Sequence, residues 1–252
     1  MNDSTPDSSV LFALGPCGFS GAAYASGNAA FRHHHMGRLL HRCGVLLPQW
    51  LDGEELLSEC RSLEQTCWRE LGYAKAPLFD DDLPTFLMED ASGRPLVLSV
   101  PLTPLELSAR LTVAVPSPLP ASSPVGTNLE RLVRLLGFTH FESQWLLWAY
   151  CLARFGSGLL PAIPLSDEQQ GCERLALLCE VPVDVVRDAV ALCRLHAWGL
   201  LHGVDDAAMP SSLAGWLSAC DPFAEWIESS YASDSDLMRA LCQALVLPYA
   251  TS

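Results

Sequence analysis

Residues 166–201 decide the predicted fold and read SDEQQGCERLALLCEVPVDVVRDAVALCRLHAWGLL. Apolar residues recur there at spacings of three and four in two runs, the second covering residues 183–198. Such spacing is typical of amphipathic helices, and only a few residues lie between the runs. Ala176 is small enough to let two helices pack closely, and Val181 can fill the corner between them. The stretch therefore predicts a helix-turn-helix, and the Gly-Leu-Leu at 199–201 favours a winged-helix-like module.

The polar stripe on the second of these helices is nearly neutral. It consists of Asp184, Arg187, Asp188, Ala191 and Arg194. The segment 202–206, which would form the tip of the wing, carries Asp205 and Asp206. A helix that reads DNA brings basic or amide side chains to bases and phosphates, and phosphate repels acidic groups. The stripe and the wing therefore favour recognition of protein over recognition of DNA.

The charge of the whole chain points the same way. It contains 15 lysines and arginines against 29 aspartates and glutamates, which gives a formal net charge of −14. Nucleic acids and anionic membrane surfaces attract cationic proteins, so we expect neither as a partner. The acidity favours a protein partner with a basic surface, or serves solubility alone.

Several classes of protein are disfavoured by single residue types. Lys75 is the only lysine and no glycine-rich phosphate loop contains it, which excludes a Walker-type nucleotide site. The ten cysteines include no Cys-x-x-Cys pair, and we interpret them as structural thiols of a reducing cytosol. Residues 1–9 are polar, unlike a signal peptide, and the apolar run 145–153 is too short to span a bilayer. We expect a cytoplasmic protein.

A proline-rich segment, residues 116–126, divides the chain in the predicted organisation. Proline stiffens the backbone and removes hydrogen-bond donors, so such a run is typical of a linker. Residues 127–252 would form a helical, winged-helix-like domain. Residues 1–115 would form a small α+β domain, with partial disorder expected in residues 1–28, which are rich in Gly, Ala and Ser. The predicted fold class is α+β, mainly α.

The pattern before residue 116 combines both kinds of element. The predicted helices are 31–43 and 52–71, and the predicted strands are 85–88, 96–100 and 111–115. The segment 90–94, Asp-Ala-Ser-Gly-Arg, is a plausible hairpin turn between the first two strands.

Helix-start signals are frequent after the proline-rich segment. Three capping boxes are predicted, at Thr127-x-x-Glu130, Thr139-x-x-Glu142 and Ser166-x-x-Gln169. They would open helices 127–137, 141–155 and 166–180. Asp221-Pro222 and Ser233 predict two further helix starts, and Pro248 would end the last helix.

A resemblance to a known family rests on this region. Residues 128–138, NLERLVRLLGF, followed by FExxWLL at 141–147, resemble the region that precedes the ATPase domain in a group of bacterial AAA+ proteins. There a short helix ending in Leu-Leu-Gly leads to an acidic, apolar helix and then to a helix-turn-helix ending in Gly-Leu-Leu. Residues 211–247 resemble the connector to the ATPase domain, so the likeness covers Asn128–Leu247.

The family's catalytic motifs are absent from this sequence. It has no phosphate loop, no acidic Mg²⁺-binding motif and no arginine fingers, so no catalytic residue carries over. The resemblance implies an accessory region without a reaction of its own. Such a region is either the front of a longer ATPase or a stand-alone protein that shares the helical module.

Histidines 33–35, with His41 and Cys43, are the best candidate for a metal site. Zinc needs three or four ligands that converge, but adjacent histidines on a helix point in different directions. At most two of them could share a site, His34 and His41 being seven residues apart. We interpret the group as a solvated polar end of a helix, and we predict no metal and no cofactor.

Two further motifs fall short of a catalytic or cation site. Residues 18–22, GFSGA, approach the Gly-x-Ser-x-Gly elbow of hydrolases but carry alanine at the last glycine position. The aspartates 80–82 lack the spaced oxygen ligands of a calcium loop. We interpret them as a solvated acidic turn that could attract an arginine-rich partner.

Aromatic side chains recur along the predicted helix 141–155. They are Trp145, Trp148, Tyr150 and Phe155, and a second set, Trp216, Phe223 and Trp226, follows near the C-terminus. Such a stripe is typical of a core. If it is partly exposed, it forms a groove for a partner helix, with Trp145 and Trp148 as anchors.

The sequence thus predicts a non-catalytic protein-recognition or regulatory region. The residues predicted to bind its partner are Trp145, Trp148, Asp80, Asp81, Asp82, Asp205 and Asp206. The partner would be another protein with a basic surface, with self-association left open and no membrane involved.

Two alternatives remain open. A winged-helix transcriptional regulator would need a basic face built from Arg131, Arg134, Arg187 and Arg194. An enzyme in the N-terminal half would need His and Cys or Ser groups that converge in a pocket.

Overall fold

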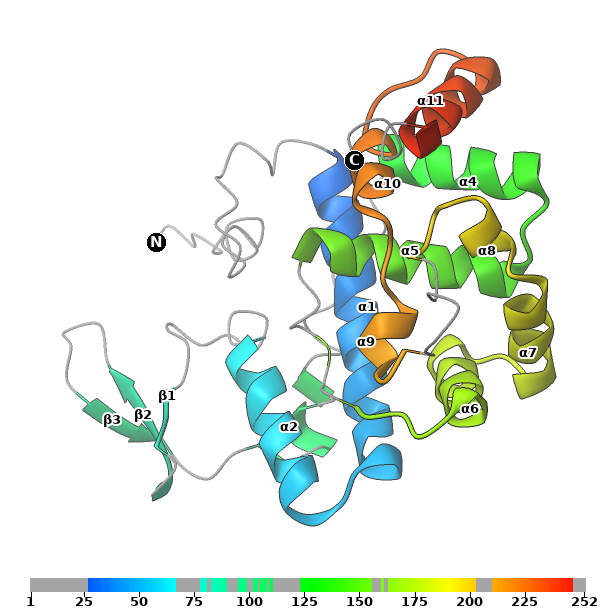
Figure 1. The fold of residues 1–252 in the computed structure, drawn as a ribbon. Coiled ribbons are helices and arrows are strands. Elements are labelled where there is room, and N and C mark those ends of the chain that lie inside the picture. The colour runs from blue at the N-terminus through cyan, green and yellow to red at the C-terminus, as the bar shows by residue number, and fades with distance from the viewer. Residues whose placement is uncertain are drawn as a thin grey trace, which may run out of the picture.

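The computed structural model is mainly helical, as predicted, and Figure 1 shows its arrangement. The structure describes residues 27–66, 78–80, 83–89, 95–98, 102–103, 105–107, 109–110, 123–155, 160, 163–202 and 210–246. The helices are α1 (Gly27–Trp50), α2 (Gly53–Thr66), α4 (Pro124–Leu136), α5 (His140–Phe155), α6 (Glu168–Cys179), α7 (Val183–Leu192), α8 (Arg194–Ala197), α9 (Leu213–Trp216), α10 (Asp221–Trp226) and α11 (Asp234–Val246). The strands are β1 (Leu78–Asp80), β2 (Leu83–Glu89) and β3 (Pro95–Leu98). Within these ranges, no helix has the length and apolarity that crossing a membrane requires.

Helix α1 lies at the centre of the packing and contacts α2, α4, α5 and α6. Leu39, Cys43 and Leu47, each four residues from the next, are fully buried on one face. The predicted helix 31–43 was too short at both ends. Gly44 disfavours a helix interior, but the helix continues because Leu46 and Leu47 beyond it are buried in the core.

Residues from both sides of the predicted linker contribute to one hydrophobic core. Leu47 and Leu63 precede it and Leu132 follows it, and all three belong to the same buried cluster. Ser123 and Pro124, placed in the linker by the sequence, instead begin α4, with Ser123 as its N-cap. Residues 116–122 lie outside the described residues. The two predicted domains therefore meet in a shared core, at least through α1 and α2.

The small sheet has the order β1-β2-β3 and is antiparallel throughout. Strands β2 and β3 pair with Phe86 opposite Leu98 and Met88 opposite Leu96, which confirms the two strands predicted around the turn at 90–94. The third observed strand is β1, which precedes them, while the predicted strand 111–115 lies outside the described residues. The predicted helix 52–71 is α2, described as far as Thr66.

Two predicted helix starts are confirmed. At α5, the backbone N–H of Thr139 donates to Glu142 Oε2 over 2.7 Å, and the N–H of Glu142 donates to Thr139 Oγ1 over 3.2 Å. This is the reciprocal pattern of a capping box. At α11, the N–H of Asp236 donates to Ser233 Oγ over 3.1 Å. The end of α4 is also as predicted, because Gly137 adopts φ 64° as its C-cap.

Three other predicted starts are displaced. Helix α4 begins at Pro124, so Thr127 lies inside it and caps nothing. Helix α6 is capped by Asp167, whose side chain accepts from the N–H of Gln170, one residue after the predicted Ser166. Helix α10 has Cys220 as its N-cap instead of Asp221. In each case the observed N-cap lies within about four residues of the predicted one.

The predicted helix-turn-helix consists of α6 and α7. Glu180 adopts the left-handed conformation with φ 57°, and the N–H of Val181 donates to Ala176 O over 3.0 Å, which turns the chain between the helices. The predicted single helix 183–198 is wrong, because Cys193 has φ 49° and separates α7 from α8. This break lets Leu195 enter the core, where it is buried.

Two isolated antiparallel bridges flank the helix-turn-helix. One joins Pro164 to Ser212, and the other joins Leu201 to Ala219. The bridges place the segment after α8 beside the segment that contains α9. Of the predicted wing tip at 202–206, only His202 belongs to the described residues.

Candidate functional site

The outer face of α7 is exposed and chemically mixed. Its exposed side chains, called the α7 face below, are Asp184, Val185, Arg187, Asp188, Ala191 and Leu192. At about 100° per residue, Asp184 and Asp188 lie near the middle of that face. Val185 and Leu192 lie along one edge and Arg187 lies along the other. Leu192 is 64% exposed, although it is a large apolar side chain. Such a surface can bury apolar area against a partner and also pair charges with it.

Arg194, which the sequence placed in the same stripe, is engaged elsewhere. It forms an ion pair with Glu142 of α5, in which its Nε donates to Oε1 over 2.9 Å. A second guanidinium nitrogen donates to Gly137 O over 2.9 Å. Burial alone would raise the pKa of Glu142, but the hydrogen bonds from Arg194 and Thr139 outweigh it and lower that pKa. The pair holds α8 against the start of α5.

Arg131 and Arg134 of α4 are likewise paired within the molecule. Both contact Asp234 at the start of α11, over 2.7 and 2.8 Å. Their hydrogen bonds lower the pKa of the Asp234 carboxyl, so it stays charged. Of the four arginines that a DNA-binding face would need, only Arg187 is exposed without an ion pair to a described residue. The basic face required by the transcriptional-regulator alternative is not assembled in the described residues.

Trp145 and Trp148, predicted as anchors for a partner, are buried, at 2% and 3% exposure. Trp145 donates from Nε1 to Trp216 O over 2.7 Å, and its ring stacks on Trp216 at a centroid distance of 6.3 Å. Neither indole can reach a partner on the surface. The stripe is core because α5 has helices on several sides, which the three-residue spacing of its tryptophans alone does not reveal.

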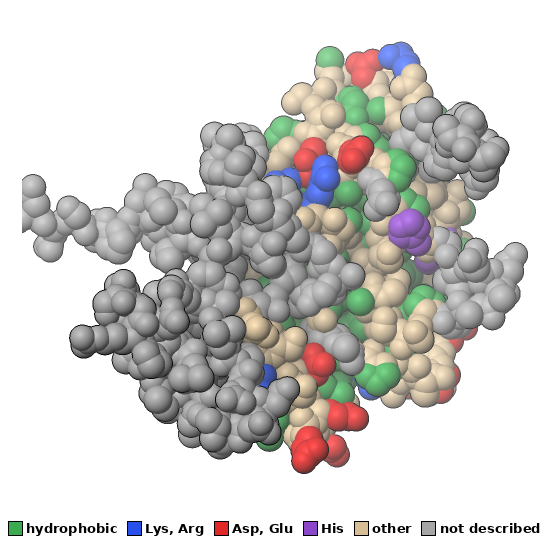
Figure 2. Space-filling view, turned by 60° about the vertical axis from the view of Figure 1, so that its left-hand side comes forward, with side chains coloured by type: hydrophobic (Ala, Val, Ile, Leu, Met, Phe, Trp, Pro, Cys, Tyr) green, Lys and Arg blue, Asp and Glu red, His purple; other side chains and the backbone are tan. Residues whose placement is uncertain are grey.

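The predicted acidic residues fall mostly outside the described residues. Asp80 ends β1, and Asp81, Asp82, Asp205 and Asp206 lie outside the described residues. A different acidic group is visible where α2 begins. Asp52, Glu54 and Glu55 are exposed there, and Figure 2 shows acidic side chains at that end of the molecule.

The histidine group is not the solvated helix end expected from the sequence. His34 and His35 lie inside α1 and are buried, with Phe31 and His35 rings 4.4 Å apart. Burial, together with His34 and Arg38 nearby, lowers the pKa of His35 to about 3. No group of three or more metal-binding side chains occurs among the described residues. The elbow-like segment 18–22 lies outside them.

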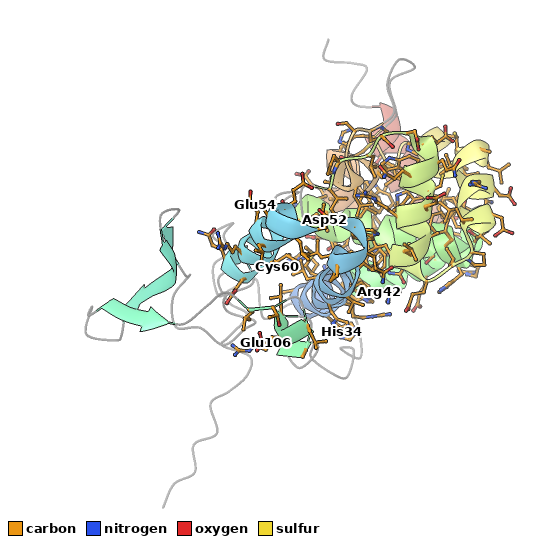
Figure 3. All side chains as sticks on the ribbon, turned by 90° about the horizontal axis from the view of Figure 1, so that it is seen from below. His34, Arg42, Asp52, Glu54, Cys60 and Glu106 are labelled. Atoms are coloured by element: carbon orange, nitrogen blue, oxygen red, sulfur yellow. The ribbon has the colours of Figure 1, made fainter. Side chains whose placement is uncertain are left out.

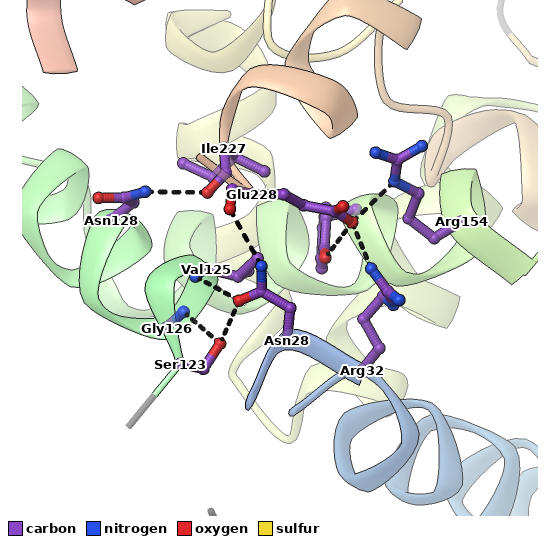
Figure 4. Close-up of polar contacts among 10 residues, drawn as sticks. Asn28, Arg32, Ser123, Val125, Gly126, Asn128, Arg154, Ile227 and Glu228 are labelled. Atoms are coloured by element: carbon purple, nitrogen blue, oxygen red, sulfur yellow. Dashed lines mark hydrogen bonds and ion pairs between the residues drawn. The ribbon is translucent and has the colours of Figure 1, made fainter. Parts of the chain in front are cut away.

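A partly buried polar cluster joins α1 and α5 to the turn after α10, and no pattern in the sequence predicts it. Oε1 of Glu228, just after α10, accepts hydrogen bonds from Arg32 of α1 and from Tyr150 and Arg154 of α5 (Figure 4). The Tyr150 and Arg154 distances are both 2.8 Å. Burial and the Glu228 carboxylate raise the pKa of Tyr150, so it keeps its proton. No local pattern could reveal partners separated by 74 to 196 residues.

Asn28 extends this cluster to the start of α4. Its Oδ1 accepts from the N–H of Val125 over 3.0 Å and from Ser123 Oγ over 2.9 Å, while its Nδ2 donates to Glu228 O over 3.0 Å. Asn128 of α4 adds bonds to Ile227 O and Ser229 O. These hydrogen bonds connect α1, α4 and α5 to the turn after α10, although Arg154 and Glu228 remain partly exposed, and we interpret the cluster as structural.

Comparison of the chain with family models, with curated proteins and with solved structures finds no match. The function must therefore be argued from the residues and their geometry.

Proposed function

We propose that this chain is a recognition module without a reaction of its own, which binds a protein with a basic surface through the α7 face. The observation that carries the proposal is the combination on that face of exposed apolar and acidic side chains. Val185, Asp188 and Leu192 are spaced by three and four residues, so they form one continuous row on the helix.

The row has the chemistry of a docking surface. Leu192, 64% exposed, can fill a pocket on the partner, which removes water from the side chain and from the pocket. Asp184 and Asp188 beside it can pair with lysine or arginine at the rim and speed the encounter. The net charge of −14 adds a long-range attraction for a basic protein.

The helix is also rigidly supported, as a recognition element must be. Val186 and Ala189 are buried on its inner side. The left-handed residues Glu180 and Cys193 define where it begins and ends. Because the apolar residues of the α7 face are not needed for this packing, their exposure has no structural explanation among the described residues.

The order of the helices supports a proposal about the kind of protein that this module serves. A short helix α4, the helix α5, the helix-turn-helix and the later helices follow the arrangement expected from the resemblance to the AAA+ accessory region. The bridges at 164–212 and 201–219 fit a winged-helix-like variant of it. We therefore include in the proposal that the module serves an AAA+ ATPase in the cytoplasm, where the free thiols of its described cysteines are stable.

The test compares two charge reversals in the full chain. Asp188→Lys on α7 should abolish capture of a partner at low salt, while Asp236→Lys on α11 should leave it unchanged. Each substitution replaces an aspartate in a helix with lysine, so the two variants carry the same net charge. A photo-crosslinking residue at 192 should label the partner captured, and raising the salt to about 0.5 M should weaken capture, because screening shortens the reach of charge.

The opposite results are equally clear. Equal capture by both reversals, or labelling of no protein from position 192, would overturn the proposal. A DNA mobility shift abolished by Arg187→Gln would replace it with the transcriptional-regulator alternative.

A further inference from the structure

A pocket of about 550 Å³ lies between α1, α5 and the end of α6. Helix α1 supplies Arg38, His41 and Arg42; α5 supplies His140, Gln144 and Trp148; α6 and its C-cap supply Leu178, Cys179 and Glu180. The volume is within the range of small-molecule sites in proteins. The pocket lies beside the turn of the helix-turn-helix, but none of its lining residues belongs to the α7 face.

The lining concentrates cationic and donor groups in an otherwise acidic chain. Its one carboxylate is Glu180, which is paired with Arg42 over 2.9 Å. Arg42 also donates to Leu177 O over 2.6 Å and reaches these partners from the side of α1 that faces α6 (Figure 3). Arg38 is exposed at the rim, and no described acid pairs with it. Its positive charge is therefore not neutralised within the described residues.

Three N–H donors of the lining have no acceptor. They are Arg42 Nε, Gln144 Nε2 and Trp148 Nε1, all shielded from solvent. A buried donor without an acceptor costs free energy, because it gives up its hydrogen bonds to water. Several such donors on residues that line one pocket, together with the exposed guanidinium of Arg38, favour a ligand that only accepts hydrogen bonds.

The same two helices show what group satisfies such a lining. At the other end of the α1–α5 contact, Arg32, Tyr150 and Arg154 surround the carboxylate of Glu228. There the chain itself supplies an oxyanion to two arginines and a third donor. At the pocket the corresponding groups are Arg38, Gln144 and Trp148.

We propose that this pocket binds a small organic anion. Its oxyanion, a carboxylate or a phosphate, accepts hydrogen bonds from Arg38 and the neighbouring donors, and its carbon skeleton lies in the pocket beside Trp148. Charge-assisted hydrogen bonds of this kind are stronger than neutral ones, and a guanidinium matches the planar geometry of an oxyanion. The site is independent of protein recognition by the α7 face.

The experiment titrates the full chain with benzoate, phenyl phosphate and benzamide. Benzamide has the shape of benzoate without its charge, so it should not bind. One or both anions should shift the indole N–H resonance of Trp148, assigned with the Trp148→Phe variant, in a saturable way. The stronger of the two anions identifies the ligand as a carboxylate or a phosphate.

Two substitutions test whether the pocket residues are responsible. Arg38→Gln should weaken binding at least about tenfold, which corresponds to the loss of one charge-assisted hydrogen bond. Arg239→Gln, at an exposed arginine on α11, removes the same charge elsewhere and should change affinity less than about twofold. Both side chains are exposed, so both variants should fold.

Absence of saturable shifts with either anion would overturn the proposal. Equal loss in the two arginine variants would also overturn it, since it would show attraction to the overall charge only. Equal binding of benzamide would show an apolar site without anion recognition and would exclude it as well.

Discussion

The two ends of the α1–α5 contact carry similar side chains and differ in what satisfies them. At one end Arg32 and Arg154 meet Glu228, which the chain brings from the turn after α10 (Figure 4). At the other end Arg38 lies at the rim of a pocket whose buried Gln144 and Trp148 nitrogens lack acceptors. The first arrangement holds the molecule together, whereas the second leaves its hydrogen-bonding capacity unused.

This difference separates structural from functional polarity within one protein. A buried polar group that is fully paired fixes the position of neighbouring elements. A polar group that is buried and unpaired lowers stability, so it has to be explained by something other than folding. The predictions below break or sharpen this distinction.

The largest effect is expected at the end of the α1–α5 contact where Glu228 pairs with the arginines. Glu228→Gln keeps the size of the side chain but removes the carboxylate charge that contacts Arg32, whose side chain is 9% exposed, and Arg154. Loss of one partner of a buried pair should lower the free energy of unfolding by about 3 kcal/mol. Urea unfolding followed by circular dichroism measures this. Asp236→Asn, which breaks the exposed pair with Arg239, is the matched control and should cause no measurable change.

A second, pH-dependent effect is expected at the junction of α5 and α8. Glu142→Gln should lower the free energy of unfolding by about 2 kcal/mol at neutral pH, because charge-assisted hydrogen bonds from Arg194 are lost. The pKa of Glu142 is lowered in the folded state, so its contribution is present above the ordinary carboxyl pKa and disappears as pH falls through the lowered value.

Unfolding measured from pH 7 down to pH 3 checks the sign of this effect. The stability of the original chain should fall towards that of Glu142→Gln as Glu142 takes up a proton. Parallel curves over the whole range would show that the carboxylate form contributes nothing.

A smaller effect compares two buried tryptophans on α5. Trp145 donates to Trp216 O, whereas Trp148 Nε1 has no acceptor. Phenylalanine removes a similar volume at both sites, so the two costs should differ by the hydrogen bond alone. Trp145→Phe should be less stable than Trp148→Phe by about 1 kcal/mol. If the two variants are equally stable, the Trp148 nitrogen is satisfied in solution and the comparison between the two ends loses its basis.

The sequence predicts those parts of this fold whose partners are close in the chain. The capping box of Thr139 and Glu142 was found because both hydrogen bonds span three residues. The turn between α6 and α7 was found because apolar periodicity stops and restarts around it. The break at Cys193 was missed because no local rule favours a left-handed cysteine there; burial of Leu195 after it supplies the reason.

The candidate sites were harder to predict than the helices. The unusually apolar second helix of the helix-turn-helix was visible in the sequence, but only the fold shows that Leu192 remains exposed while Val186 is buried. Trp148 was identified, but as an anchor on the surface. Its part in a pocket depends on α1, which lies on the other side of the predicted linker.

The last effect tests which of two residues begins α4. Ser123 and Thr127 are both hydroxyl residues near the start of α4, and a residue in α1, Asn28, decides between them. It accepts a hydrogen bond from Ser123 Oγ and another from the N–H of Val125, so it completes the cap from 97 residues away. A partner that far along the chain is invisible to any rule based on neighbouring residues.

Ser123→Ala should therefore lower the free energy of unfolding by about 1 kcal/mol, the usual cost of losing an N-cap. Thr127→Ala should have the opposite sign, raising it by up to about 0.5 kcal/mol, because Thr127 is an exposed interior helix residue and alanine is the better helix former. The two variants remove the same kind of hydroxyl four residues apart and are compared in one urea titration. If Thr127→Ala is the more destabilising, α4 begins at Thr127 as the sequence suggested. The hydrogen bonds of Asn28 would then not fix the start of α4. The contrast between the two ends of the α1–α5 contact, one with its polar groups paired and one without, would then lose support.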